Sequence, residues 1–164
     1  MSAPLFIGRR AALLALSATL AACAAPRLRA PGETVWTGRL ALRVDSQPPQ
    51  AFSALFELRG HAREGELMLT SPLGQTLATV RWSPEGAELQ RGSDLRRRAS
   101  LDELTTELSG APLPVIAMFD WLAGREAAAG GWQAELSQHA QGRLVARRDQ
   151  PLPAAELRLV FEQP

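Results

Sequence analysis

The order of alternating apolar segments is the feature that most constrains this chain. Apolar residues recur at every second position within a segment, which is typical of a β-strand with one buried face. Several such segments come first, two stretches with helical spacing follow, and the alternation then returns. The predicted strands are Trp36–Val44, Phe52–Arg59, Glu66–Thr70, Thr76–Trp82, Ala87–Arg91, Trp132–Leu136, Gly142–Arg148 and Ala155–Glu162.

The links between the early strands are brief, so strands that are consecutive in the sequence are expected to pair as an antiparallel meander. The 164 residues are enough for one domain with a real core. Helices inserted into a run of strands are expected to cover the open side of the sheet. The sequence therefore predicts an α+β fold, mainly β, in which a strongly bent antiparallel sheet carries helices on its open side.

The first helix is predicted over Leu101–Ser109. Ser100 and Glu103 have the spacing of a capping box, and Gly110 suits the position just after the helix. Asp102 and Glu103 place two carboxylates in the first turn, where negative charge favours the helix dipole. We therefore interpret this acidic pair as a helix feature rather than as a catalytic site.

The second helix is predicted over Val115–Ala123, because Pro114 suits its start and Gly124 its end. Apolar residues cover most of its circumference, and Asp120 is its one charge. We interpret Asp120 as the wet edge of the helix rather than as an acid catalyst. Such a helix must be buried almost all round or must face an apolar cavity.

The first 22 residues have the pattern of a secretory signal peptide. Arg9 and Arg10 precede the apolar run Ala11–Leu20, which is too short to span a bilayer as a mature helix. The sequence Leu20-Ala-Ala-Cys23 resembles a bacterial lipobox, which implies cleavage before Cys23, attachment of diacylglyceryl to it and N-acylation of the new terminus. The alternative is an ordinary signal peptide that happens to carry a cysteine.

Two neighbouring residues bear on this choice. Cys23 is the only cysteine of the chain, so it cannot form an internal disulfide. Ala24 is not the aspartate that signals inner-membrane retention in lipoproteins of well-studied Gram-negative bacteria, which favours the outer membrane. We therefore predict a signal peptide at 1–22, a lipidated N-terminus and tether at 23–34, and a single domain at 35–164.

The charge of the mature chain is close to balanced. Removing Arg9 and Arg10 from the 18 basic residues leaves 16 arginines against 17 acidic residues, and there is no lysine. A nucleic-acid partner is not expected, because it would require a strong basic excess. The densest basic cluster is Arg96-Arg97-Arg98, which we interpret as a solvated loop; a partner or lipid-headgroup contact is the alternative.

The sequence contains no recognisable catalytic motif. It has no HExxH or GxSxG pattern, no phosphate-binding glycine loop and no Cys/His cluster. His61 and His139 fall in or near predicted loops, far apart in the sequence, and we interpret both as surface histidines. We therefore predict no catalytic residues, no metal site and no cofactor, and we expect that the protein is not an enzyme.

The segment Ser71-Pro72-Leu73-Gly74 has the chemistry of a tight turn. Ser71 is a good first residue, Pro72 presets φ at the second position, and Gly74 suits the fourth. Leu73 is thereby placed at the tip, where loops are usually polar. From these residues alone, a stray exposed leucine is the simpler interpretation, since isolated apolar residues are common on protein surfaces.

At this turn and at the two predicted helices, the chain resembles the LolB family of outer-membrane lipoprotein receptors. The matching segments are GRLALRV, FSALFEL, LMLTSPLGQT and LSGAPLPVIAMFDWLAG. The last two are the most specific, and the resemblance covers most of the region from Trp36 to Glu162. The chain departs from the family in having a shorter segment before the first strand and a short C-terminal sheet.

The resemblance implies a half-open β-barrel, covered by two or more helices, with an apolar cavity, similar to the fold of the periplasmic carrier LolA. It implies a receptor that accepts mature lipoproteins from a LolA-like carrier, holds their acyl chains in the cavity and inserts them into the inner leaflet of the outer membrane. It also implies that Leu73, supported by Ser71, Pro72 and Gly74, protrudes and engages the membrane.

Three further expectations follow. The protein is expected to be a lipid-anchored monomer that faces the periplasm from the outer membrane of a Gram-negative bacterium. A lipid-binding lipoprotein with another cargo and a structural or assembly lipoprotein are the alternative functions. The residues expected either to line the cavity or to fill a plain core are Leu40, Leu42, Phe52, Phe56, Leu67, Leu69, Ile116, Met118, Phe119, Trp121 and Leu122.

Overall fold

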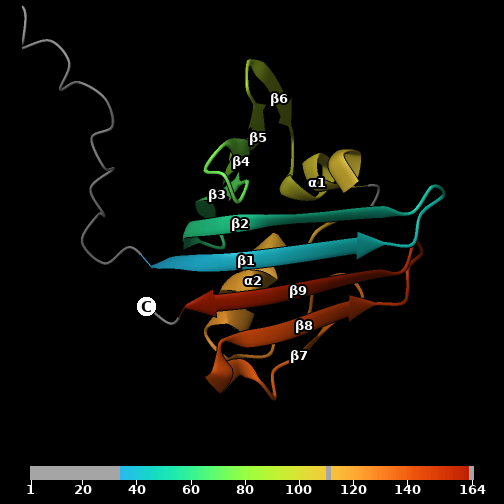
Figure 1. The fold of residues 1–164 in the computed structure, drawn as a ribbon. Coiled ribbons are helices and arrows are strands. Elements are labelled where there is room, and N and C mark those ends of the chain that lie inside the picture. The colour runs from blue at the N-terminus through green and yellow to red at the C-terminus, as the bar shows by residue number, and fades with distance from the viewer. Residues whose placement is uncertain (1–33, 110–111, 163–164) are drawn as a thin grey trace, which may run out of the picture. The chain divides into compact units, whose positions relative to one another are not determined.

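The computed structural model describes residues 34–109 and 112–162 of the chain. The predicted signal peptide and Cys23 lie outside these residues. In the described part, nine antiparallel strands form one sheet in the order β6-β5-β4-β3-β2-β1-β9-β8-β7 (Figure 1). The strands are β1 Val35–Val44, β2 Gln50–His61, β3 Glu64–Thr70, β4 Thr76–Ser83, β5 Gly86–Arg91, β6 Asp94–Arg98, β7 Trp132–Glu135, β8 Arg143–Arg148 and β9 Ala155–Glu162.

The sheet is curved and open, as predicted for this fold class. Strands β1 to β6 follow one another as a meander, and β9 pairs with β1, which joins β7 and β8 to the other side. Figure 1 shows β1, β2, β8 and β9 running across the view, whereas β3 to β6 turn away from that direction. The eight predicted strands are all present, with ends that differ by two residues at most.

The two helices, α1 Leu101–Ser109 and α2 Val115–Leu122, lie where the sequence predicts them. The backbone N–H of Glu103 donates to Ser100 Oγ at 3.2 Å, which is one half of the predicted capping box. Helix α1 packs beside β5 and β6. None of the helices in the described residues is long and apolar enough to cross a membrane.

The prediction that Arg96-Arg97-Arg98 is a loop was wrong, because these residues form most of β6. Every residue of β6 is exposed, so this edge strand has no apolar face to produce an alternating pattern. Its arginines are solvated, as expected, and they are also paired: Arg96 contacts Glu107 at 2.8 Å, and Arg97 contacts Glu88 at 2.8 Å. The hydrogen bond from Arg96 holds the pKa of the Glu107 carboxyl below its ordinary value.

The core lies between the inward face of the sheet and helix α2. Alternate residues of the strands form one continuous apolar cluster with α2. Five of the eight residues of α2 are buried, and Trp121 and Leu122 are fully buried. Asp120 is at the wet edge of the helix, as predicted, where its Oδ1 accepts hydrogen bonds from the Arg125 guanidinium at 2.7 and 3.0 Å.

His139 differs from its prediction as a surface histidine. It begins the short 3-10 helix η1 His139–Gln141, and its half-buried ring packs against Phe161 with 5.2 Å between ring centroids. Its Nε2 lies 2.8 Å from the backbone carbonyl of Leu122, so the imidazole can donate to the last turn of α2. His61, by contrast, is exposed at the end of β2.

Arg148 is a buried cation that the sequence did not single out. It is 1% exposed at the end of β8, and no carboxylate of the described residues lies within ion-pair distance of it. Its Nη2 donates to the Pro153 carbonyl at 2.8 Å, its Nη1 donates to the Pro112 carbonyl at 3.4 Å, and its guanidinium lies 5.4 Å from the Trp132 ring centroid. Burial lowers the pKa of Arg148 from its ordinary value. The side chain therefore joins the segment before α2 to the loop before β9.

Replacing Arg148 with alanine is expected to lower the free energy of unfolding by about 2–4 kcal/mol, because the partly buried Pro153 carbonyl loses a donor, the Pro112 carbonyl keeps only the Trp132 donor, and Trp132 loses a packing partner. Urea unfolding followed by tryptophan fluorescence measures this change. The matched control is Arg147→Ala, which removes an exposed ion pair with Glu156 and should cost about 0–1 kcal/mol. Equal losses for the two variants would contradict a structural role for the buried cation.

Candidate functional site

The turn between β3 and β4 is closed by three hydrogen bonds around Ser71. The Gly74 N–H donates to the Ser71 carbonyl at 2.9 Å, which is the hydrogen bond of a β-turn. The Ser71 N–H donates to the Gln75 carbonyl at 2.8 Å, and the Gln75 N–H donates to Ser71 Oγ at 3.2 Å. Gly74 has a φ of +83°, which a residue with a side chain rarely adopts. The turn is therefore a closed unit of defined geometry.

Leu73 projects from this turn into open space. Its side chain is 90% exposed, the highest value among the exposed large apolar residues of the described chain. Exposing a leucine side chain to water is unfavourable, and the folded monomer gains no stability from this exposure. The turn therefore presents one apolar side chain in a fixed position.

The eleven residues predicted to line a cavity or fill a core separate into three groups. Two are exposed, Phe52 at 39% and Ile116 at 38%, and two, Leu69 and Phe119, are partly buried against the core. The other seven are buried in the continuous core: Leu40, Leu42, Phe56, Leu67, Met118, Trp121 and Leu122. Most of the predicted set is therefore packed side chain against side chain.

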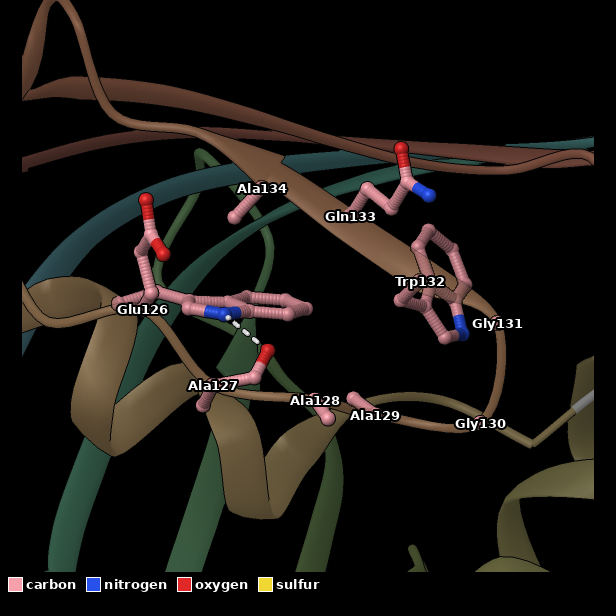
Figure 2. Close-up of a pocket in the computed structure, with 10 residues that line it drawn as sticks. Glu126, Ala127, Ala128, Ala129, Gly130, Gly131, Trp132, Gln133 and Ala134 are labelled. Atoms are coloured by element: carbon pink, nitrogen blue, oxygen red, sulfur yellow. Dashed lines mark hydrogen bonds between the residues drawn. The ribbon is translucent and has the colours of Figure 1, made fainter.

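Two pockets lie along the segment that follows α2. The larger, of about 670 Å³, is lined by Trp121 and residues 126–134 (Figure 2). Figure 2 shows Ala127, Ala128 and Ala129 along one side of it and Trp132 on the strand opposite. The smaller pocket, of about 240 Å³, shares this alanine segment and extends to Pro112 and Ile116. No motif in the sequence predicts these pockets, although the run of small residues over 127–131 leaves such space.

Both flanks of α2 are held by indole N–H groups. Trp121 Nε1 donates to the Ala127 carbonyl at 3.2 Å, the contact that is dashed in Figure 2. Trp132 Nε1 donates to the Pro112 carbonyl at 3.2 Å. Helix α2 and its flanking segments form the cover of the sheet. Together with His139 and Arg148, these indole groups hold the cover in place through hydrogen bonds to a few backbone carbonyls.

The described residues contain no group of three or more His, Cys, Asp or Glu side chains that could hold a metal ion. The polar side chains that line the pockets are the amide of Gln133 and the carboxylates of Asp102, Asp120 and Glu126. Since these residues offer no metal site, the most distinctive surface feature with a defined geometry is the Leu73 turn described above.

The curved sheet, its helical cover and its protruding leucine define an open half-barrel with an apolar interior. The LolB family model, described as "Outer membrane lipoprotein LolB", matches residues 35–156 of this chain. The chain belongs to the LolB family. This membership confirms the predicted resemblance and the predicted location, a lipid-anchored protein of the Gram-negative outer membrane.

Several relatives named "Outer-membrane lipoprotein LolB" align over most of the chain. The relative from Bordetella petrii is 35% identical over 178 residues, which cover 91% of this chain and 89% of its own length. The relative from Cupriavidus necator is 38% identical over 148 residues, covering 84% and 74%. The relative from Bordetella pertussis is 34% identical over 181 residues, covering 93% and 91%.

Replacing Gly74 with alanine is expected to lower the free energy of unfolding by about 1 kcal/mol. No atom lies within 4 Å of the position that the new Cβ would take, so the cost comes from the positive φ alone. Chemical denaturation measures the change, and Gln75→Ala is the control, since Gln75 contributes only backbone groups to the turn. An increase in stability for Gly74→Ala would show that the turn does not require this conformation.

Proposed function

We propose that this protein accepts mature lipoproteins from a LolA-like periplasmic carrier, holds their acyl chains in its apolar interior and inserts them into the inner leaflet of the outer membrane. The observation that carries the proposal is Leu73, 90% exposed on a closed turn of a LolB-family half-barrel. The proposed role is receptor and insertion protein rather than enzyme, acting as a monomer without a cofactor.

The interior supplies the apolar environment that an acyl chain needs. Each buried CH₂ group of an acyl chain contributes about 0.8 kcal/mol. Transfer between two apolar interiors is then nearly balanced, so this step requires no nucleotide hydrolysis. Direction comes from tighter binding by the receptor and from the final insertion of the chains into the bilayer.

Acyl-chain binding requires the cover to move, because most of the predicted wall residues fill the core. Helix α2 is the element best suited to this movement. Its ends are held by the few hydrogen bonds that Trp132, Arg148 and His139 donate to the Pro112 and Leu122 carbonyls. The face of β2 that points inward reaches the surface at Phe52, which is 39% exposed, and this offers a route to the interior.

Leu73 would act by entering the apolar region of the bilayer. Burial of one leucine side chain contributes about 1.5–3 kcal/mol. That energy is too small to anchor a protein but large enough to bias its orientation. The predicted acyl chains on Cys23 would supply the stable attachment, since several chains together hold a protein firmly.

The mature protein, purified from its native membrane, is expected to carry acyl chains on Cys23. Intact-mass spectrometry should show a mass that exceeds the polypeptide from residue 23 by one diacylglyceryl group and one N-linked acyl group. Cys23→Ser is the control and should lack this addition. An unmodified Cys23 in the mature protein would refute the predicted lipid anchor.

Replacing Leu73 with glutamate is expected to leave folding and cargo acceptance unchanged and to lower delivery to liposomes by about tenfold or more, because the carboxylate opposes insertion into the bilayer. The assay follows a labelled lipoprotein from a LolA-like carrier to the receptor and then to vesicles. Val160→Glu is the matched control, since Val160 is 53% exposed on the outer side of β9. Unchanged delivery by Leu73→Glu would refute the membrane role.

The same assay separates the alternative functions. A lipid-binding lipoprotein with another cargo would bind free lipid but would not accept a lipoprotein from the carrier. A structural or assembly lipoprotein would bind neither, because its core would stay closed around residues such as Phe56 and Met118. Acceptance of the labelled lipoprotein, followed by its delivery, is the result expected here.

A further inference from the structure

A second exposed leucine lies in the loop between β8 and β9. Leu152 is 72% exposed and stands between Pro151 and Pro153. Only Leu73 is more exposed among the exposed large apolar residues of the described chain. The sequence does not mark this residue, because the segment lacks the turn signature of the Leu73 hairpin.

The loop that carries Leu152 is held from both sides. The buried guanidinium of Arg148 donates to the Pro153 carbonyl at 2.8 Å. The Asp45 N–H donates to the Ala154 carbonyl at 2.8 Å, which joins the loop to the end of β1. The two prolines also restrict φ on either side of the leucine. Leu152 is therefore presented on a supported loop, as Leu73 is on its closed turn.

The strand register places both leucines at the same end of the strands. Val44 lies opposite Gln50 and Ala155, so the β1–β2 and β8–β9 loops share one edge. Figure 1 shows these two loops together at the right-hand end of the sheet.

The Leu73 turn lies at the same edge of the sheet but is displaced along the strand direction. It begins at Thr70, which lies opposite Leu55, and Leu55 lies opposite Arg39, five positions before Val44. A progressive offset of neighbouring hairpins is what strand tilt produces around a barrel. The turns that carry Leu73 and Leu152 therefore belong to one rim of the half-barrel, which we call the leucine rim.

The leucine rim has uncharged tips. The turn residues 46–49, 71–75, 92–93 and 150–153 contain no charged side chain, although charged residues stand directly beside three of them: Asp45, Asp149, and Arg91 with Asp94. At the opposite rim, the turns 62–63 and 84–85 carry Arg63 and Glu85, whereas the longer β7–β8 connection, 136–142, carries no acidic or basic residue other than His139. A rim whose tips are uncharged and carry two separate leucines suits a flat surface with an apolar interior. It does not suit a nucleic acid, and the leucines are too isolated to form the contiguous apolar patch of a stable protein interface.

We propose that Leu152 is a second point of contact with the lipid bilayer, so that the leucine rim as a whole faces the membrane. This inference rests on the proposed function, in which Leu73 enters the bilayer. Two points of contact restrict the orientation of the half-barrel on the membrane more than a single leucine can. The tips carry no basic side chain that would attract anionic lipid, so the contact should form on phosphatidylcholine vesicles.

The test is contact-dependent quenching in the full-length lipidated protein. Leu152→Cys, Leu73→Cys and Ala62→Cys are each labelled with bimane and reconstituted in phosphatidylcholine vesicles whose acyl chains carry bromine. Ala62 is exposed in the turn at the opposite rim, so it serves as the matched control. Strong quenching at positions 152 and 73, with little at 62, is the expected result.

A second measurement uses Leu152→Glu and Val160→Glu in the lipoprotein-transfer assay. Leu152→Glu should lower delivery to vesicles by about tenfold, the loss expected from removing one buried leucine. It should leave handover from the carrier unchanged, and Val160→Glu should leave both steps unchanged. Thermal melting of each variant checks that the fold is retained.

The outcomes distinguish this inference from the proposed function. If position 73 is quenched and position 152 behaves like 62, the second contact is refuted while the role of Leu73 stands. If Leu152→Glu slows handover in the absence of vesicles, Leu152 contacts the carrier and the inference is overturned. If neither leucine is quenched and Leu73→Glu delivers normally, the proposed function fails together with the inference.

Discussion

Burial of the inward face of the curved sheet beneath α2 is the interaction on which the rest of this structure depends. Residues from distant strands share one core, and Trp121 and Leu122 of the helix are fully buried in it. Apolar burial contributes about 25 cal/mol for each Å² removed from water, so this contact dominates the stabilisation. The core sets the curvature of the sheet, and the curvature determines where its turns emerge.

Polar groups then position the cover that the apolar contact holds in place. Trp121, Trp132, His139 and Arg148 all reach backbone carbonyls close to the ends of α2 or in its flanking segments. A buried carbonyl without a donor costs about 1–3 kcal/mol, so these hydrogen bonds favour one arrangement of the helix over others. The displacement of α2 proposed for acyl-chain binding would break these hydrogen bonds together with part of the apolar contact.

A rigid core also gives the turns their fixed directions. The Leu73 turn and the Leu152 loop both leave the sheet at the leucine rim, and each is closed or supported by hydrogen bonds. Exposed leucines are unfavourable in water and favourable in lipid, which supports the bilayer contact that we propose for both. Membership of the LolB family gives this arrangement a consistent biological setting.

Local patterns in the sequence were sufficient for most of the elements. Alternation determined the faces of eight strands, Ser100 and Glu103 determined the start of α1, and Ser71, Pro72 and Gly74 determined the Leu73 turn. Only the tertiary structure decided that β6 is a strand, that Arg148 is buried, that His139 contacts α2, and that Leu42 is core whereas Phe52 is exposed. Alternation shows which side chains share a face, but it does not show what covers that face. What covers a strand face, and how the strands are aligned in the sheet, depend on residues far away in the sequence. The same holds for the leucine rim, which places Leu73 and Leu152 at the same end of the sheet.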